Sequence, residues 1–213
     1  MILEIICFSK LNIMNKKTII IFLLTGFASL TVLGQLPEKA EDISPLLIGE
    51  KIPAVTLVSA DGIKQNLTDL ISSKPTVLLI YRGGWCPYCN AHLSDIQKAE
   101  SDILGLGYQI FAISPDSPEI LKQSGEKQNL QYSLYSDADG KLIKALGIAF
   151  RAPERYSGKL DKSSGGFNEG FLPVPSLFVA DTSGKILFEY VNPDYKTRIG
   201  SELLIAVLKE LNN

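Results

Sequence analysis

One stretch of this sequence constrains the fold more than any other: an apolar strand candidate that runs directly into a pair of cysteines. Thr76–Tyr81 is almost entirely apolar, and Arg-Gly-Gly-Trp then leads into Cys86-Pro-Tyr-Cys89. A helix is expected from about Pro87 to Leu104, because proline is tolerated in the first turn of a helix, where its missing N–H breaks no hydrogen bond. The two thiols are therefore predicted at a junction between a strand and a helix.

That junction favours thiolate chemistry. Unpaired amide N–H groups and the positive end of the helix dipole stabilise negative charge, and such motifs lower a cysteine pKa from about 8.5 to roughly 3.5–7.5. A Cys-x-x-Cys beside a strand–helix–strand pattern is typical of redox proteins. Cys86 is predicted to be the more exposed nucleophile and Cys89, one turn further in, the resolving thiol, while the reverse assignment stays open.

Two structural explanations of the cysteine pair are less favoured. A disulfide across so short a loop would restrict the unfolded chain by only about 2 kcal/mol. Zinc normally takes four ligands, and the sequence offers a single histidine, His92, to join the two thiols. No metal and no other cofactor are therefore predicted, and the pair is interpreted as a catalytic site.

The N-terminus has the layout of a secretory signal. A basic Asn-Lys-Lys precedes the apolar run Thr18–Phe27, and small residues lead to Gly34, where cleavage is expected. This fits best if translation starts at Met14. We therefore predict a signal peptide over residues 1–34 and an exported protein, periplasmic or extracellular. Membrane association is expected only if the signal stays uncleaved, and the run is shorter than the roughly 18–20 residues of a span.

A single domain is predicted after the signal. The chain has 213 residues, enough for one substantial core. Its net charge of −2 gives no electrostatic reason to expect a nucleic-acid partner. Residues 35–47 are predicted as a polar lead-in, and residues 48–213 as the domain.

Strand and helix patterns alternate along this domain. Strands are predicted at Ala54–Ser59 and Ile63–Leu67, which form a hairpin, and at Thr76–Tyr81, Tyr108–Ser114, Tyr132–Tyr135, Leu177–Ala180 and Lys185–Val191. Helices are predicted at Pro87–Leu104, Ser117–Lys127, Ala138–Leu146 and Gly200–Leu211. The order predicts an α/β fold: a mixed central β-sheet with helices on both faces and an N-terminal β-hairpin extension. Ala149–Leu172 lacks a clear period and is predicted as a long loop, either functional or a tolerated insertion.

Several motifs together resemble a known family. The Trp85–Cys89 motif and Val174-Pro175 before a hairpin resemble the thioredoxin fold, in which a cis-proline faces the thiols. Ala112–Asp116, Ser136–Gly140 and Asp181–Ile186 resemble the alkyl hydroperoxide reductase/thiol-specific antioxidant family, in its peroxiredoxin-like branch. The resemblance covers roughly Ile48–Leu211.

The resemblance implies a thiol-based antioxidant enzyme. It would reduce hydrogen peroxide or alkyl hydroperoxides through a Cys86–Cys89 redox disulfide, which a thioredoxin-type reductant would regenerate. Arg82 is a candidate for stabilising the thiolate or a departing oxyanion, unless it is simply a solvated charge at a strand end. Trp85 is a candidate for shielding the thiols or contacting a partner, and Pro175 for holding the backbone against the thiols. The weaker candidates for a site role are Arg151, Arg155 and His92.

The sequence departs from the family in its peroxide-binding motif, Pro-x-x-x-Thr/Ser-x-x-Cys. With the family cysteine at Cys89, Cys86 takes the hydroxyl position and Arg82 the proline; with it at Cys86, the positions hold Gly83 and Leu79. Pro175 stands where the family has an arginine. An exported thiol–disulfide oxidoreductase acting on protein cysteines therefore remains the alternative. A third, less favoured reading is a redox-inert or sensing module that binds a partner through the long loop.

Overall fold

The strand that precedes the cysteine motif lies in the middle of the sheet. The computed structural model describes residues 35–212, and in it β3 (Thr76–Ile80) is buried at every position. It pairs in parallel with β4 (Gln109–Ser114) and antiparallel with β8 (Ser176–Ala180). A continuous apolar run is what a strand covered on both faces requires. The signal peptide predicted for residues 1–34 lies outside the described residues.

The main sheet is mixed and has the order β2-β1-β5-β4-β3-β8-β9. Its remaining strands are β1 (Thr56–Ser59), β2 (Lys64–Asn66), β5 (Ser133–Ser136) and β9 (Ile186–Val191). The antiparallel hairpin of β1 and β2 extends the sheet beyond β5, to which β1 is paired. The predicted N-terminal hairpin extension is therefore confirmed.

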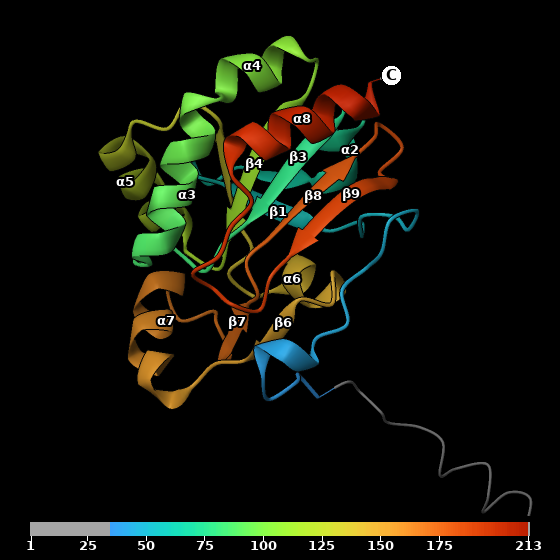
Figure 1. The fold of residues 1–213 in the computed structure, drawn as a ribbon. Helices are drawn as coiled ribbons and strands as arrows, with labels where there is room; N and C mark the ends of the chain where they lie inside the picture. Colours follow the sequence, from blue (N-terminus) through green and yellow to red (C-terminus); the bar gives the residue numbers. More distant parts are fainter. Residues whose placement is uncertain (1–34, 213) are drawn as a thin grey trace, which may run out of the picture. The chain divides into compact units, whose positions relative to one another are not determined.

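Helices cover both faces of this sheet (Figure 1). One face carries α3 (Pro87–Lys98), α4 (Glu100–Gly105), α5 (Pro118–Gln128) and α8 (Ser201–Leu211). The other carries α2 (Leu67–Ile71) and α6 (Lys141–Ala145). The predicted thioredoxin-like α/β fold is confirmed. None of the helices in residues 35–212 has the length and apolar character needed to span a membrane.

Two predicted helices have different bounds. The helix predicted over Pro87–Leu104 is two helices, because the chain turns at Ala99, whose amide bonds to the carbonyls of the preceding turn. The helix predicted from Ala138 starts only at Lys141. Gly140 before it is left-handed at φ 72°, and the buried carboxylate of Asp137 accepts the amides of the first turn of α6.

The segment predicted as a long loop, Ala149–Leu172, is largely structured. Its ends, β6 (Ala149–Arg151) and β7 (Phe171–Pro173), pair antiparallel as a second small sheet. Between them lie η2 (Glu154–Tyr156) and α7 (Ser157–Ser164). The segment is ordered by burial of isolated apolar residues such as Leu160, which is 1% exposed, and these are too sparse to give a sequence period.

The lead-in also packs onto the domain. It contains η1 (Ala40–Asp42), and the apolar side chains of Leu36, Ile43 and Leu46 lie against the core on the α6 side of the sheet. The amide of Leu46 donates to the carbonyl of Leu146 at 3.0 Å. Residues 36–47 therefore add buried surface as well as polar groups.

Candidate active site

The N-terminal end of α3 presents the two thiols. Cys86 is the N-cap residue of the helix, Pro87 occupies its first turn, and Cys89 lies one turn further in. Both cysteines are free thiols. They are 2% and 1% exposed, so both thiols are buried, and Cys86 is the less buried of the two, which is the order that its position in the sequence predicts. Both belong to a buried core cluster against which Trp85 packs.

The two thiols have opposite acidities. The pKa of Cys86 is lowered from 9.0 to about 6, chiefly because the Cys89 thiol donates a hydrogen bond to it. Burial opposes this shift, and the Cys89 amide and the guanidinium groups of Arg82 and Arg198 add to it. The same hydrogen bond, with burial, raises the pKa of Cys89 well above its ordinary value. The pair therefore holds one thiolate, on Cys86, and one proton, on Cys89.

Arg198 is a site residue that sequence reasoning missed. It lies in the loop before α8, and its Nη2 is 3.7 Å from the Cys89 sulfur. Its charge adds to the lowering of the Cys86 pKa and partly opposes the rise of the Cys89 pKa. No local signal marks it, because 109 residues separate the two partners. Arg198 thus brings a guanidinium to the thiols.

Arg82 is buried in a cage of aromatic rings. Its guanidinium carbon lies 4.3 Å from the ring centroid of Tyr195, 4.9 Å from that of Tyr156 and 5.2 Å from that of Trp85. Only 4% of Arg82 is exposed, so the interpretation as a solvated charge is wrong. Burial between rings keeps the charge away from water and close to the thiols, where a guanidinium acts more strongly.

Trp85 lies between the thiols and a surface groove. Its ring packs against the core cluster that contains both cysteines. The ring centroid is 5.5 Å from that of Tyr156, and the ammonium of Lys159 lies 5.0 Å from it. Trp85 also lines the groove between α5 and α7. The shielding and contact roles predicted for this side chain are thus both compatible with its position.

Asp116, after β4, fixes the loop that leads into the motif. Its Oδ2 accepts the amide of Gly84 at 2.6 Å, while the carbonyl of Gly84 accepts the side chain of Asn90 at 2.9 Å. Gly83 adopts φ 136°, and an added Cβ would meet Asp116 Oδ1 and the Trp85 indole nitrogen. Burial raises the pKa of Asp116 to about 6. The sequence showed Asp116 only as part of a family motif.

Pro175, another candidate from the sequence, lies close to this site. The cis-proline expectation for Pro175 is wrong, since no peptide bond in residues 35–212 is cis. The amide of Val174 donates to the Ile148 carbonyl, and β8 begins at Ser176, directly after Pro175. Pro175 lines a pocket of about 280 Å³ together with Arg82.

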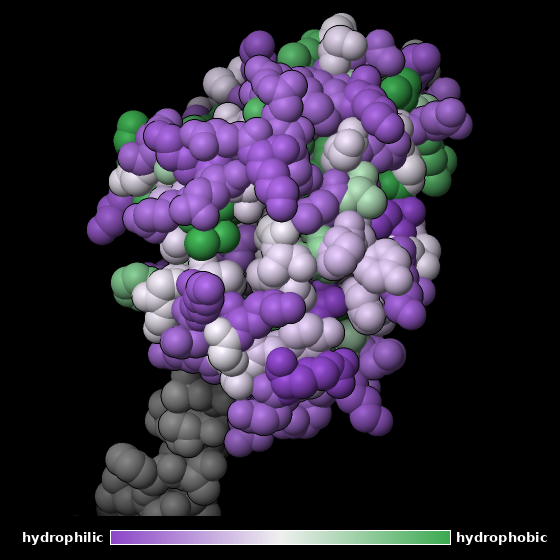
Figure 2. Space-filling view, turned by 90° about the vertical axis from the view of Figure 1, so that its left-hand side faces the viewer, coloured by the Kyte–Doolittle hydropathy of each residue, from purple (hydrophilic) through white to green (hydrophobic). Residues whose placement is uncertain are grey.

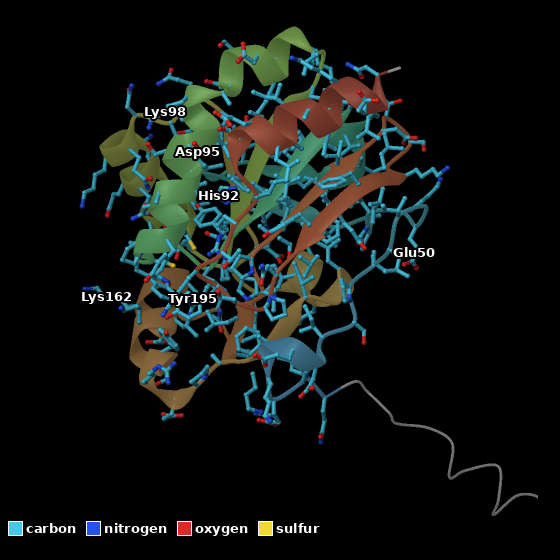
Figure 3. All side chains as sticks on the ribbon, viewed as in Figure 1. Glu50, His92, Asp95, Lys98, Lys162 and Tyr195 are labelled. Carbon is cyan, nitrogen blue, oxygen red and sulfur yellow. The ribbon has the colours of Figure 1, made fainter. Side chains whose placement is uncertain are left out.

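His92 lies on α3, and Figure 3 shows Tyr195 further toward α7. Burial, with the charge of Arg198, lowers the pKa of His92 to about 4, so the imidazole is neutral at physiological pH. Arg151 is exposed and bonds to Glu38 at 2.8 Å, with no contact to the thiols. Arg155 lies 4.9 Å from the Tyr156 ring centroid. Within residues 35–212, no three His, Cys, Asp or Glu side chains gather as a metal site needs.

The sheet topology and the helix-capping thiol pair define a thioredoxin-fold protein. Residues 48–188 match the AhpC/TSA family, and the chain belongs to that family. Peroxiredoxin Bcp of Escherichia coli is 27% identical over 168 residues, which cover 79% of this chain and 99% of the relative. A putative peroxiredoxin of Mycobacterium tuberculosis is 31% identical over 144 residues, covering 68% and 84%. Peroxiredoxin bcp1 of Schizosaccharomyces pombe is 32% identical over 135 residues, covering 63% and 67%.

Solved structures agree on the fold. Reduced Prx3 of Vibrio vulnificus in complex with hydrogen peroxide superposes with a TM-score of 0.66 at 21% identity, covering 76% of this chain and 99% of that one. Peroxidoxin BcpB of Mycobacterium tuberculosis gives 0.62 at 20% identity, covering 77% and 97%. At these identities the likeness concerns the fold alone.

Proposed function

We propose that this protein is a peroxiredoxin-like thiol peroxidase that reduces hydrogen peroxide or alkyl hydroperoxides. The observation that carries the proposal is the placement of Cys86 at the N-terminal end of α3 with Cys89 one turn further in, where the pKa of Cys86 is lowered toward the thiolate form. Family membership and relatives named peroxiredoxins support peroxide as the oxidant. Cys89, hydrogen-bonded to Cys86, supplies the second thiol that a catalytic cycle needs.

The first step forms one S–O bond and breaks one O–O bond. The Cys86 thiolate attacks the terminal peroxide oxygen and becomes a sulfenic acid, while the other oxygen leaves as an alkoxide or hydroxide and takes up a proton from water. The positive charges of Arg82 and Arg198 both lower the pKa of Cys86. Their charges would stabilise the oxygen that leaves.

The second step joins the two sulfurs. The Cys89 sulfur attacks the Cys86 sulfenic sulfur, the S–O bond breaks, and the Cys89 proton leaves with the oxygen as water. A dithiol reductant of the thioredoxin type would then reduce the Cys86–Cys89 disulfide to two thiols and become a disulfide itself. We propose that this cycle operates outside the cytoplasm, as the N-terminal sequence layout suggests.

The test is a coupled assay on the purified full chain. NADPH oxidation through thioredoxin reductase and thioredoxin should follow added peroxide, and Cys86→Ser should abolish it. Cys89→Ser should leave one rapid turnover, observed as loss of a single peroxide equivalent, because the sulfenic acid still forms. Absence of peroxide consumption by the wild type, with both thiols titratable, would refute the proposal.

A second candidate is an exported thiol–disulfide oxidoreductase acting on protein cysteines. The observation in its favour is the site composition: Pro175 replaces the family arginine, and the peroxide-binding hydroxyl is absent in either register. Reduction of insulin disulfides by the dithiol form, with no peroxide turnover, would select this function. Loss of both activities in Cys86→Ser is expected under either function.

A further inference from the structure

An open groove lies beside the thiol end of α3. It has a volume of about 570 Å³ and is bounded by two helices and the Gly84-Trp85 turn. The α5 wall consists of Ile120, Gln123, Ser124 and Lys127, which recur at helical spacing, and the α7 wall of Lys159, Lys162 and Ser163. The walls are tied together by the amide of Ser117, which donates to the Ser163 carbonyl at 2.8 Å.

The groove carries positive charge on a protein of net charge −2. Lys127, Lys159 and Lys162 line it, and no aspartate or glutamate does. None of the three lysines takes part in an ion pair within residues 35–212. Figure 2 shows a largely hydrophilic surface on the side that carries α5 and α7, and Lys162 projects outward from α7 in Figure 3.

Trp85 connects the groove to the redox centre. The ring lines the groove and also packs against the cluster that holds both sulfurs, and Cys86 is the next residue in the chain. Because the two cysteines are almost fully buried, a reductant reaches their sulfurs only if the side chains around them move. A partner that occupies the groove contacts the Trp85 ring, which packs against the cluster that holds the cysteines.

We propose that the groove is the docking surface for the reducing protein, and that it selects a partner with carboxylates flanking its exposed thiols. The inference rests on the proposed function, since it names the partner of that cycle. The three ammonium groups are exposed and come from two helices, which suits several carboxylates spread over a protein surface. A site for a small anion would instead surround it with buried donors.

The test measures reduction of the Cys86–Cys89 disulfide in the full-length Cys7→Ser chain, oxidised with diamide so that peroxide activity is not needed. Two synthetic Cys-Gly-Pro-Cys peptides, flanked by glutamates or by lysines, serve as reductants. Stopped-flow fluorescence follows the reaction, because Trp85 is the single tryptophan of the sequence. Near 20 mM salt we expect the acidic peptide to react about 5- to 30-fold faster than the basic one, and the two rates to converge near 0.5 M.

Charge reversal of two groove lysines tests whether the groove causes the faster reaction of the acidic peptide. The double variant Lys159→Glu/Lys162→Glu should lose or invert the preference, while the matched control Lys64→Glu/Lys185→Glu, at exposed positions outside the groove, should keep it. Thermal melting checks that both variants fold. Equal rates for the two peptides at low salt, or equal effects of the two double variants, would overturn the docking proposal.

Two further outcomes also count against it. A stronger loss of preference in sulfate than in chloride at equal ionic strength would indicate a site for a small anion. A chain that diamide cannot oxidise offers no disulfide for a partner to reduce. If peroxide does not form the Cys86–Cys89 disulfide, the proposed peroxidase function is refuted. The docking proposal is then still tested by the peptide comparison, because that experiment forms the disulfide with diamide.

Discussion

The strongest prediction concerns how Cys89 controls the acidity of Cys86. The leading cause of the low Cys86 pKa is the hydrogen bond from the Cys89 thiol. Cys89→Ala removes that donor, whereas Cys89→Ser keeps a donor of similar size. We therefore expect the alanine variant to raise the pKa of Cys86 and the serine variant to leave it much closer to about 6.

The size of the shift follows from the strength of the bond. A hydrogen bond to a charged group contributes about 1.5–3 kcal/mol, and one pKa unit corresponds to about 1.4 kcal/mol. The pKa of Cys86 should therefore rise by about 1–2 units in Cys89→Ala. At pH 7 the thiolate fraction would fall from about 0.9 to between about 0.1 and 0.5. The Cys89 amide and the two guanidinium groups remain, which keeps the pKa below its ordinary value.

The assay is alkylation by iodoacetamide as a function of pH, checked by thiolate absorbance at 240 nm. All proteins carry Cys7→Ser, so that Cys86 is the reactive thiol. At pH 7 Cys89→Ala should react about 2- to 9-fold more slowly than the serine variant, and the rates should meet above pH 9. Identical pH profiles for the two variants would show that the hydrogen bond does not set the acidity, and the reasoning would fail.

Three further predictions follow from the surroundings of the thiols. Burial raises the pKa of Asp116 from 3.8 to about 6, so ionisation of this carboxyl lowers the stability of the fold progressively as pH rises from about 4 to 6. Asp116→Asn should therefore be more stable than the wild type by on the order of 1–3 kcal/mol at pH 8 and equally stable near pH 4. Urea unfolding at both pH values measures this difference. Tyr156→Leu removes one ring from the Arg82 cage and should lower the free energy of unfolding by about 1 kcal/mol more than Tyr156→Phe does, and equal losses would contradict the cage. Gly83→Ala forces a side chain at φ 136° against the Trp85 indole and should cost about 1–3 kcal/mol in thermal or urea unfolding. Gly158→Ala, which has open space around it inside α7, is the matched control and should not lower stability.

The sequence by itself determined the elements whose signals are local. The buried run of β3 and the Pro87 start of α3 place the two thiols at a strand–helix junction, and the alternation of strands and helices gives the thioredoxin-like sheet. These features could be predicted because hydrophobic period and capping preference depend on neighbours within one or two turns of chain. The helix predicted over Pro87–Leu104 is interrupted at Ala99, a break that these local signals did not predict.

Only the tertiary structure decided which distant charges and aromatic rings surround the thiols. Arg198 reaches Cys89 across 109 residues, and Asp116 holds Gly84 across 32. The burial of Arg82 between aromatic rings depends on η2 and on the loop before α8, which no local pattern brings together. The shift of a pKa depends on burial and on distances between charges. The neighbouring Cys89 lowers the Cys86 pKa locally, whereas the burial and the guanidinium charge of Arg198 that also act on this pKa arise only when distant segments pack.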